Sequence, residues 1–331
     1  MTQHPVRSAS RRRFLAAIPA AASAVAWPAS AQGAYPQRPI RFIIPNTPGS
    51  SIDTIGRIVM AEMSKLLHQP AVPDNKGGAS GALGVELGRT SAPDGYTLII
   101  GSSSAITTAP LLQKAVSYEP LRDFDLITLI ALLPNVLVCN PALPVRNAAE
   151  FIAYAKSKGG TTNMASAGIG SASHLAGVAF QSAAGFQSLH VPYKGGSQGV
   201  ASVTSGETDW VLTPAPAAMA LVGGGRLRLL GHSMPASTRP LGDVPSLATT
   251  VPGFEFSGWI GLLGPRGLPA QVTSDLGDTV AQALRQPDLV RVFESNGAVP
   301  TPSSPEAFRS YLTGDIAQNR KVIQIAGIQR E

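Results

Sequence analysis

The sequence has a single cysteine, Cys139, among its 331 residues. A lone cysteine cannot form an intramolecular disulfide, and it excludes zinc ribbons, CxxC redox sites and disulfide-stabilised scaffolds. Common enzyme motifs are also missing. The histidines show no HExxH spacing, no GxxxxGK[ST] phosphate loop occurs, and no serine lies in a GxSxG elbow. We therefore expect no catalytic residues, no metal and no cofactor.

Charge is scarce outside the N-terminus. Four of the 26 basic residues and none of the 20 acidic ones lie in residues 1–31, so residues 32–331 hold 22 basic and 20 acidic residues. A nearly neutral body with scattered basic residues lacks the electrostatic footprint needed to bind a phosphate backbone. Nucleic acid is therefore excluded as a partner.

Long apolar runs are absent after residue 31. The longest, 126–139, is interrupted by Pro134-Asn135 and is predicted to form two buried strands, not a membrane span. The chain is 44% hydrophobic, and its 34 glycines and 28 prolines stay below the fraction typical of low-complexity disorder. These values fit a globular protein of roughly two domains.

The first 31 residues have the layout of an export signal. Arg11-Arg12-Arg13-Phe14-Leu15 precede an uncharged, alanine-rich stretch that ends in Ala29-Ser30-Ala31. A basic start, an apolar centre and small residues at the end define a signal peptide, and paired arginines before Phe-Leu are typical of the twin-arginine type. The alternative is a membrane anchor, for which the run is short and the alanines provide little driving force. We predict a signal peptide over 1–31, cleaved near Ala31, and a protein of the periplasm.

The rest of the chain alternates strand and helix patterns. β-branched runs at 40–45, 96–101, 162–166, 188–193, 209–213, 226–232 and 254–263 predict strands, and apolar spacings of three and four predict helices after most of them. Such alternation indicates an α/β fold with a largely parallel sheet. The chain is expected to cross twice between two lobes, which gives lobe 1 at 32–137 plus 254–331 and lobe 2 at 138–253. A ligand cleft is expected between the lobes.

Two loops, one in each predicted lobe, could hold an anion. Pro45 to Asp53 and Ser166 to His174 each follow a strand, contain glycines and start a helix. The first N–H groups of a helix have no intrahelical partner and lie at the positive end of its dipole, so each loop is a candidate cradle for a carboxylate. Ordinary helix capping explains either loop taken alone equally well. The segments 77–81 and 101–104 supply further donors.

At this point the chain resembles the periplasmic solute receptors of tripartite tricarboxylate transporters, called Bug receptors. The resemblance runs from about Tyr35 to the C-terminus. Its segments are 35–41, 45–53, 75–84, 92–98, 134–138, 168–177, 190–196 and 257–263. The resemblance implies a two-lobed binding protein of type II-like fold, with two crossover strands, which closes on a small carboxylated solute and delivers it to integral membrane permease subunits. We expect a monomer.

The loops and the resemblance together predict one set of ligand-binding residues: Thr47, Gly49, Ser50, Ser51, Asp53, Ser102, Ser103, Ala167, Gly168, Gly170, Ser171, His174, Tyr193 and Thr213. Thr213 stands where many family members carry an acidic residue, which predicts a ligand without a free amine. Ser50 replaces a usual glycine. From the loop alone, Gly170→Val is expected to abolish binding and to leave the melting temperature nearly unchanged.

Two other functions remain open from the sequence. A secreted hydrolase could use Ser171 or Ser173 with His174, because residues three apart share a helix face, but a triad also needs an acid that the sequence does not place. The same two lobes could instead serve a ligand-sensing receptor of a two-component system.

Overall fold

The computed structural model describes residues 1–2 and 35–330. The predicted signal peptide and its cleavage site near Ala31 lie outside the described residues, apart from Met1 and Thr2. The description below concerns the unit that begins at Pro36. No helix of the described part combines the length and the apolar character that a membrane span requires.

The first part of this unit alternates strands and helices up to one long strand: β1 (Ile40–Ile44), α1 (Ser51–Leu66), β2 (Ala71–Asn75), η1 (Ala79–Gly81), α2 (Ala82–Arg89), β3 (Thr97–Ser102), η2 (Ser103–Thr108), α3 (Ala109–Leu112) and β4 (Phe124–Cys139). The apolar spacing of three and four residues predicted a helix with one buried face here, and this is confirmed, because Ile52, Ile55, Val59 and Met63 of α1 are buried.

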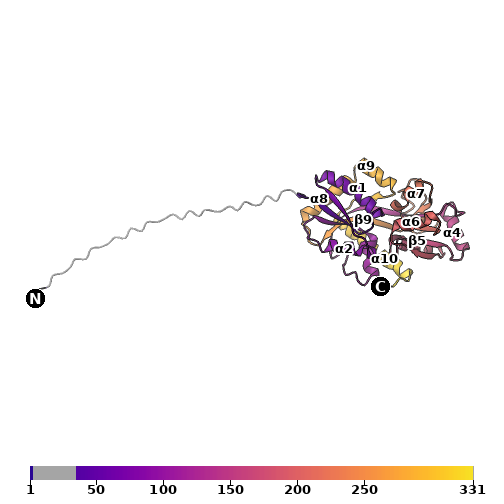
Figure 1. Cartoon of the computed structure of the whole chain (residues 1–331), viewed down its shortest axis with the longest axis horizontal. Coiled ribbons are helices and arrows are strands. Elements are labelled where there is room, and N and C mark those ends of the chain that lie inside the picture. The colour runs from indigo at the N-terminus through magenta and orange to yellow at the C-terminus, as the bar shows by residue number, and fades with distance from the viewer. Residues whose placement is uncertain (3–34, 331) are drawn as a thin grey trace. The chain divides into compact units, whose positions relative to one another are not determined.

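The second part has the elements α4 (Ala148–Ser157), β5 (Asn163–Ser166), α5 (Ala172–Ala184), β6 (Leu189–Pro192), α6 (Gly196–Ser205), β7 (Trp210–Pro214), η3 (Ala215–Ala217), α7 (Met219–Gly223), β8 (Arg228–His232) and η4 (Leu247–Thr249). The chain then returns through β9 (Ser257–Pro265), α8 (Ala270–Ala283), α9 (Pro287–Ser295), β10 (Val299–Pro300) and α10 (Pro305–Ile325). In Figure 1, α1, α2 and α8 lie on one side of β9, and α4, α6 and β5 lie on the other.

The sheet is mixed, so the expectation of a largely parallel sheet was wrong. Its strand order is β2-β1-β3-β9-β4-β7-β5-β6, with β8 and β10 also paired to β4. The outer pairs β1–β2, β1–β3, β5–β6 and β5–β7 are parallel, whereas every pair that involves β4 or β9 is antiparallel. The two strands that join the lobes run against their neighbours, which simple alternation along the chain does not reveal.

One expectation about β4 was also wrong. Residues 126–139 were predicted as two strands, but β4 runs without a break through Pro134. Residues before Asn135 pair with β9, and residues from Asn135 onward pair with β7 and β8. Pro134 lacks an N–H, and it lies where the strand exchanges one partner for others, so the missing donor does not end the strand.

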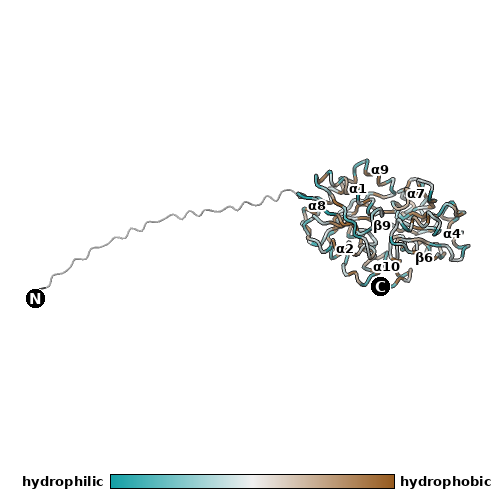
Figure 2. The backbone as a smooth tube through the Cα atoms, in the orientation of Figure 1, coloured by the Kyte–Doolittle hydropathy of each residue, from teal (hydrophilic) through white to brown (hydrophobic). Residues whose placement is uncertain are grey.

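Separate apolar clusters fill the two lobes. Trp259, Phe124 and Phe308 centre one cluster, and Trp210 and Phe151 centre another. Figure 2 shows hydrophilic and hydrophobic residues interspersed along the backbone on both sides of β9. The α/β fold has two lobes that share β4 and β9, and this arrangement sets the ends of several strands around a common space.

Candidate ligand-binding site

A cavity of about 420 Å³ lies at the carboxyl ends of strands from both lobes. This volume is in the range of small-molecule sites. One side is lined by residues after β1, β2 and β3, and the other by residues after β5, β6 and β7. The lining comprises Pro45, Asn46, Thr47, Ser50, Ser51, Ile52, Gly77–Gly81, Ser102, Ser103, Ser104, Leu133, Ala167, Ser171, Ala172, Ser173, Tyr193, Lys194, Gly195, Gly196, Thr213, Pro214, Ala217, Gly258 and Trp259.

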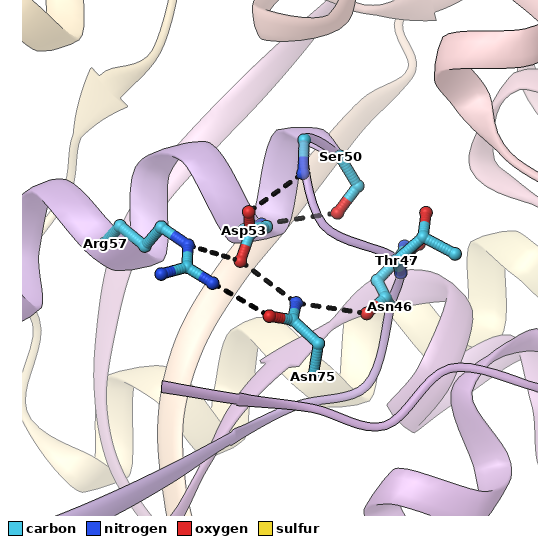
Figure 3. A network of polar contacts seen from close by, with 7 residues as sticks. Asn46, Thr47, Ser50, Asp53, Arg57 and Asn75 are labelled. Atoms are coloured by element: carbon cyan, nitrogen blue, oxygen red, sulfur yellow. Dashed lines mark hydrogen bonds and ion pairs between the residues drawn. The ribbon is translucent and has the colours of Figure 1, made fainter. Parts of the chain in front are cut away.

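The loop before α1 is held by hydrogen bonds to Asp53. The Asp53 carboxylate accepts from the Gly49 N–H (2.9 Å) and from Asn75 (3.0 Å), and it pairs with Arg57 (2.8 Å). Ser50 caps the helix by accepting from the Asp53 N–H at 3.3 Å. Figure 3 shows Asp53 at the centre of this network. Burial acts to raise the pKa of Asp53, but the Gly49, Asn75 and Arg57 bonds outweigh it and hold the pKa below its ordinary value.

The loop before α5 is held in a parallel way by a histidine. The Gly170 N–H donates to His174 Nδ1 at 3.1 Å, and Ser171 caps the helix by accepting from the His174 N–H. His174 stacks on His190 with ring centroids 3.9 Å apart, and His190 Nε2 bonds to Ser166 Oγ at 2.6 Å. Burial, with a smaller contribution from His190, lowers the pKa of His174 to about 4, and burial also lowers the pKa of His190. Both rings are therefore neutral at pH 7.

The N–H groups left without a partner are those of the first helical residues. Within the described chain, Ser51 and Ile52 of α1 and Ala172 and Ser173 of α5 form no backbone N–H hydrogen bond, and all four residues line the cavity. The glycine N–H groups are already used, since Gly49 donates to Asp53, Gly168 to Ser166 and Gly170 to His174. The available donors therefore lie two and three residues after Gly49 and Gly170.

A third helix begins at the same cavity. Gly195 and Gly196 at the start of α6 line it, together with Lys194, which forms no ion pair in the described part of the chain. Among the described residues that line the cavity, Lys194 is the one charged residue, and there is no Asp or Glu. The lining therefore carries a net positive charge.

Hydroxyl groups complete the polar lining. Ser51 and Thr213 are buried residues, with 8% and 1% of their surface exposed, and neither hydroxyl forms a hydrogen bond with another described residue. Neither hydroxyl is fully enclosed by the protein, because the one fully buried side-chain polar atom without a partner in the described chain is Asn135 Oδ1. Both hydroxyls can therefore bond to a polar guest in the cavity.

The structure brings nine of the predicted site residues to the cavity and leaves five behind its wall. Thr47, Ser50, Ser51, Ser102, Ser103, Ala167, Ser171, Tyr193 and Thr213 line it. Gly49, Asp53, Gly168, Gly170 and His174 do not, and instead form the hydrogen bonds that shape the two loops. As ligand contacts, all fourteen stay predictions.

Sequence reasoning missed several lining residues. Ile52 and Ala172 were left out of the predicted set because their side chains carry no donor, and Ser173 was named only as a candidate nucleophile. All three lie among the first residues of their helices, whose N–H groups have no intrahelical partner. Lys194, Gly195 and Gly196 follow β6 as a basic residue and a glycine pair, which could have been noticed as a third cradle. Trp259 of β9 is both buried and part of the lining.

Comparisons with known proteins agree with this geometry. Residues 55–328 match the family described as tripartite tricarboxylate transporter family receptor. Protein BugT of Bordetella pertussis is 31% identical over 309 residues, covering 93% of this chain and 94% of that protein. The structure of R. palustris Rpa4515 with adipate has a TM-score of 0.85 at 30% identity and covers 89% of this chain and 99% of that one. MatC from Rhodopseudomonas palustris with bound malate has a TM-score of 0.79 at 27% identity, with coverages of 87% and 100%. The chain belongs to the receptor family of tripartite tricarboxylate transporters.

Proposed function

We propose that this receptor captures a small carboxylate in the cavity between its lobes and delivers it to the membrane permease subunits of a tripartite transporter. The observation that carries the proposal is the set of four unpartnered N–H groups, two from α1 and two from α5, at one cavity. Helix N-termini attract anions through these donors and through the helix dipole. Solved relatives that hold adipate and malate support the ligand class.

We infer that the two lobes, 32–137 with 254–331 and 138–253, close on the ligand. Lining residues from both lobes support this, because a guest that contacts both α1 and α5 favours the state in which they approach. The proposed contacts are the nine predicted residues that line the cavity, with Ile52, Ala172, Ser173 and Lys194 added, while Gly49, Asp53, Gly168, Gly170 and His174 shape the two loops from behind its wall.

We propose further that the ligand lacks a free amine. An ammonium group needs a nearby carboxylate or several acceptors, and the lining offers no Asp or Glu. Thr213 stands in the position where an acidic residue would pair with an ammonium group, and it contributes a hydroxyl instead. Calorimetry should show that aspartate and glutamate bind more weakly than succinate and glutarate, and tighter binding of the amino acids would contradict this.

The hydrolase hypothesis receives no support from the serine and histidine geometry. Ser171 Oγ donates to the Gly168 carbonyl at 2.6 Å, and His174 Nδ1 is occupied by the Gly170 N–H. A nucleophile needs a hydrogen bond to its base. We therefore propose a binding protein that returns its solute unchanged.

The export pattern of residues 1–31 supports a periplasmic location with a twin-arginine signal cleaved near Ala31, and we propose that the mature receptor acts as a monomer. N-terminal sequencing of the exported protein and light scattering would test these two points.

A thermal-shift screen of carboxylates, followed by calorimetry, tests the main proposal. A ligand that binds only the folded state raises the melting temperature. Adipate and its uncharged diamide form a matched pair of the same shape, and the free carboxylates should bind while the diamide should not. Equal binding of both would show that the donors do not select an anion.

A further inference from the structure

A buried acidic residue, Asp315 of α10, lies directly behind the cavity wall. Trp259 Nε1 donates to Asp315 Oδ2 at 3.0 Å, and Asn319 Nδ2 donates to the same oxygen at 3.1 Å. Ser103 and Thr107 of η2 also bond to the carboxyl group. Ser103 and Trp259 line the cavity, whereas Asp315 does not. The acid is thus one hydrogen bond away from the ligand site.

The two carboxyl oxygens have unequal surroundings. Oδ2 is contacted by Trp259, Asn319, Thr107 and Ser103, whereas Oδ1 has one partner, Ser103 Oγ, at 3.3 Å. This pattern leaves Oδ1 as the oxygen that carries the proton when the acid is neutral. Oδ2 then acts as a carbonyl that accepts from the indole and amide N–H groups, and a proton on Oδ1 can be donated to Ser103 Oγ.

Among the described residues, no cation forms an ion pair with Asp315. The groups that face Asp315 from η2 and β9 are hydroxyls and an indole, and on α10 they are Asn319 and the phenol of Tyr311. The other titratable groups on elements packed against α10 are Asp125 and Cys139 of β4 and His174 of α5. None of these three forms a hydrogen bond or ion pair with Asp315 in the described chain. Burial raises the pKa of Asp315 above its ordinary value, although its four hydrogen-bond partners act in the opposite direction.

We propose that Asp315 is a positioning residue that couples ligand capture to the uptake of a proton, a step that rests on the proposed carboxylate function. When Asp315 is neutral, its proton is donated to Ser103 Oγ, and the Ser103 hydroxyl no longer donates to the carboxyl group. Ser103 Oγ also accepts from Asn319 Nδ2 at 3.2 Å, so its own proton can go to Thr107 Oγ1 at 3.3 Å or into the cavity that Ser103 lines. When Asp315 is ionised, the Ser103 hydroxyl turns to the carboxylate, and the cavity loses a donor and gains a negative neighbour. An anionic ligand therefore favours the neutral acid.

The sign of the pH dependence follows from linkage. Below the pKa of Asp315 in the free receptor, the acid is already neutral and the affinity for a fully ionised ligand is constant. Above that pKa, each binding event must take up a proton, so Kd rises by up to about tenfold per pH unit. Kd stops rising once the pH exceeds the pKa of Asp315 in the liganded receptor.

The first test needs no ligand, because Trp259 reports on Asp315. In the full chain labelled with 15N-tryptophan, the indole N–H signal of Trp259 should shift with pH along a single titration curve, and Asp315→Asn should abolish the shift. Trp210 is a built-in control, since its indole donates to the Ser188 hydroxyl at 3.1 Å. A Trp259 signal that does not titrate between pH 4.5 and 9.5 would overturn the proposal, and this result stands even if a variant does not fold.

The second test uses adipate as the probe, at pH values above and below the Trp259 midpoint and in buffers of different ionisation enthalpy. Wild type should take up a fraction of a proton that approaches one above the midpoint, while Asp315→Asn should bind with no proton uptake and a flat pH profile. Asp278→Asn, an exposed acid on α8, should behave as wild type. Binding without proton uptake would overturn the coupling and leave the carboxylate function intact. If neither adipate nor any other carboxylate bound at any pH, both proposals would be wrong.

Discussion

Asp53 and His174 each hold the loop before a helix, one in each lobe. Each is the third residue of its helix, each follows a serine cap, and each side chain accepts the N–H of the glycine just before that cap. These bonds use up the glycine donors, whereas the N–H groups of the first two residues of each helix, which line the cavity, have no partner in the described chain. One loop achieves this with a charged acid that Arg57 offsets, and the other with a neutral imidazole.

Asp53→Asn tests the first of these residues. Because the folded-state pKa of Asp53 is lowered, its stabilisation is present above the unfolded-state pKa and is lost as the pH falls through the folded-state value. We expect the variant to lose about 1–2 kcal/mol of unfolding free energy at pH 7, since a charge-assisted bond becomes a neutral one, and to approach wild type at acidic pH. Urea unfolding measures this, with the exposed Asp243→Asn as control. An equal loss at every pH would contradict the role of the charge.

His174→Gln tests the role of His174 in the loop before α5. A histidine whose folded-state pKa lies at about 4, against an ordinary value of 6.5, stabilises the fold above pH 6.5, and that stability is lost as the pH falls toward 4. In this pH window, protonation of His174 should lower the free energy of unfolding of wild type by up to about 1.4 kcal/mol per pH unit. The free energy of unfolding of the variant should fall less steeply. The exposed His68→Asn, which suits its positive φ of 51°, is the control. Identical acid profiles for wild type and His174→Gln would contradict the assignment.

At the scale of elements, most helices and strands could be predicted because their apolar spacing is local. The sequence did not predict the continuous β4, because the partner exchange at Pro134 depends on strands far along the chain. It also missed η2 and the short β10. The two loops were found as candidates from glycine and serine alone, but which N–H groups remain free depends on where the Asp53 and His174 side chains point, and spacing does not determine this.

The expected behaviour of Gly170→Val changes with the structure. Gly170 has φ of +74°, which favours glycine, and an added Cβ would lie 2.2 Å from Leu112 Cδ1 of α3. The substitution should therefore lower the melting temperature as well as the affinity, so the earlier expectation of an unchanged melting temperature is wrong. A cleaner probe of the cradle is needed.

Ala172→Pro supplies that probe. Ala172 is the first residue of α5, where proline is tolerated, and Ser171 before it has the extended backbone that a following proline requires (φ −68°, ψ 161°). The change deletes one unpartnered N–H and leaves the helix in place. We expect Kd for a carboxylate to rise about 10- to 100-fold, the value of one hydrogen bond to a charged group, with little change in melting temperature.

Ala148→Pro is the matched control for this change. Ala148 is the first residue of α4, follows an extended Asn147 cap, and does not line the cavity. Calorimetry on both variants compares the same chemical change at two helix starts. Equal affinities for wild type and Ala172→Pro would remove α5 from the anion site.

At the scale of the whole folded unit, the proposed closure of the lobes on the ligand can be tested with a covalent bridge across the cavity. Thr47 follows β1 on one side, and Gly195 precedes α6 on the other; a Cβ added at Gly195 would lie 3.4 Å from Thr47 Oγ1. Gly195 has an extended backbone (φ −178°) that accepts any residue. Two cysteines at these positions are close enough for a disulfide across the cavity, and the native Cys139 is buried and does not compete.

Thr47→Cys combined with Gly195→Cys should therefore trap the closed state when oxidised. A disulfide between the lobes removes the open state through which solute enters and leaves, so a labelled carboxylate bound before oxidation should exchange at least tenfold more slowly than in the reduced protein. Oxidised wild type and oxidised Thr47→Cys, which cannot form the bridge, should exchange at the normal rate. Full exchange through the locked protein would show that solute reaches the cavity without separation of the lobes, and the hinge would then serve something other than ligand entry.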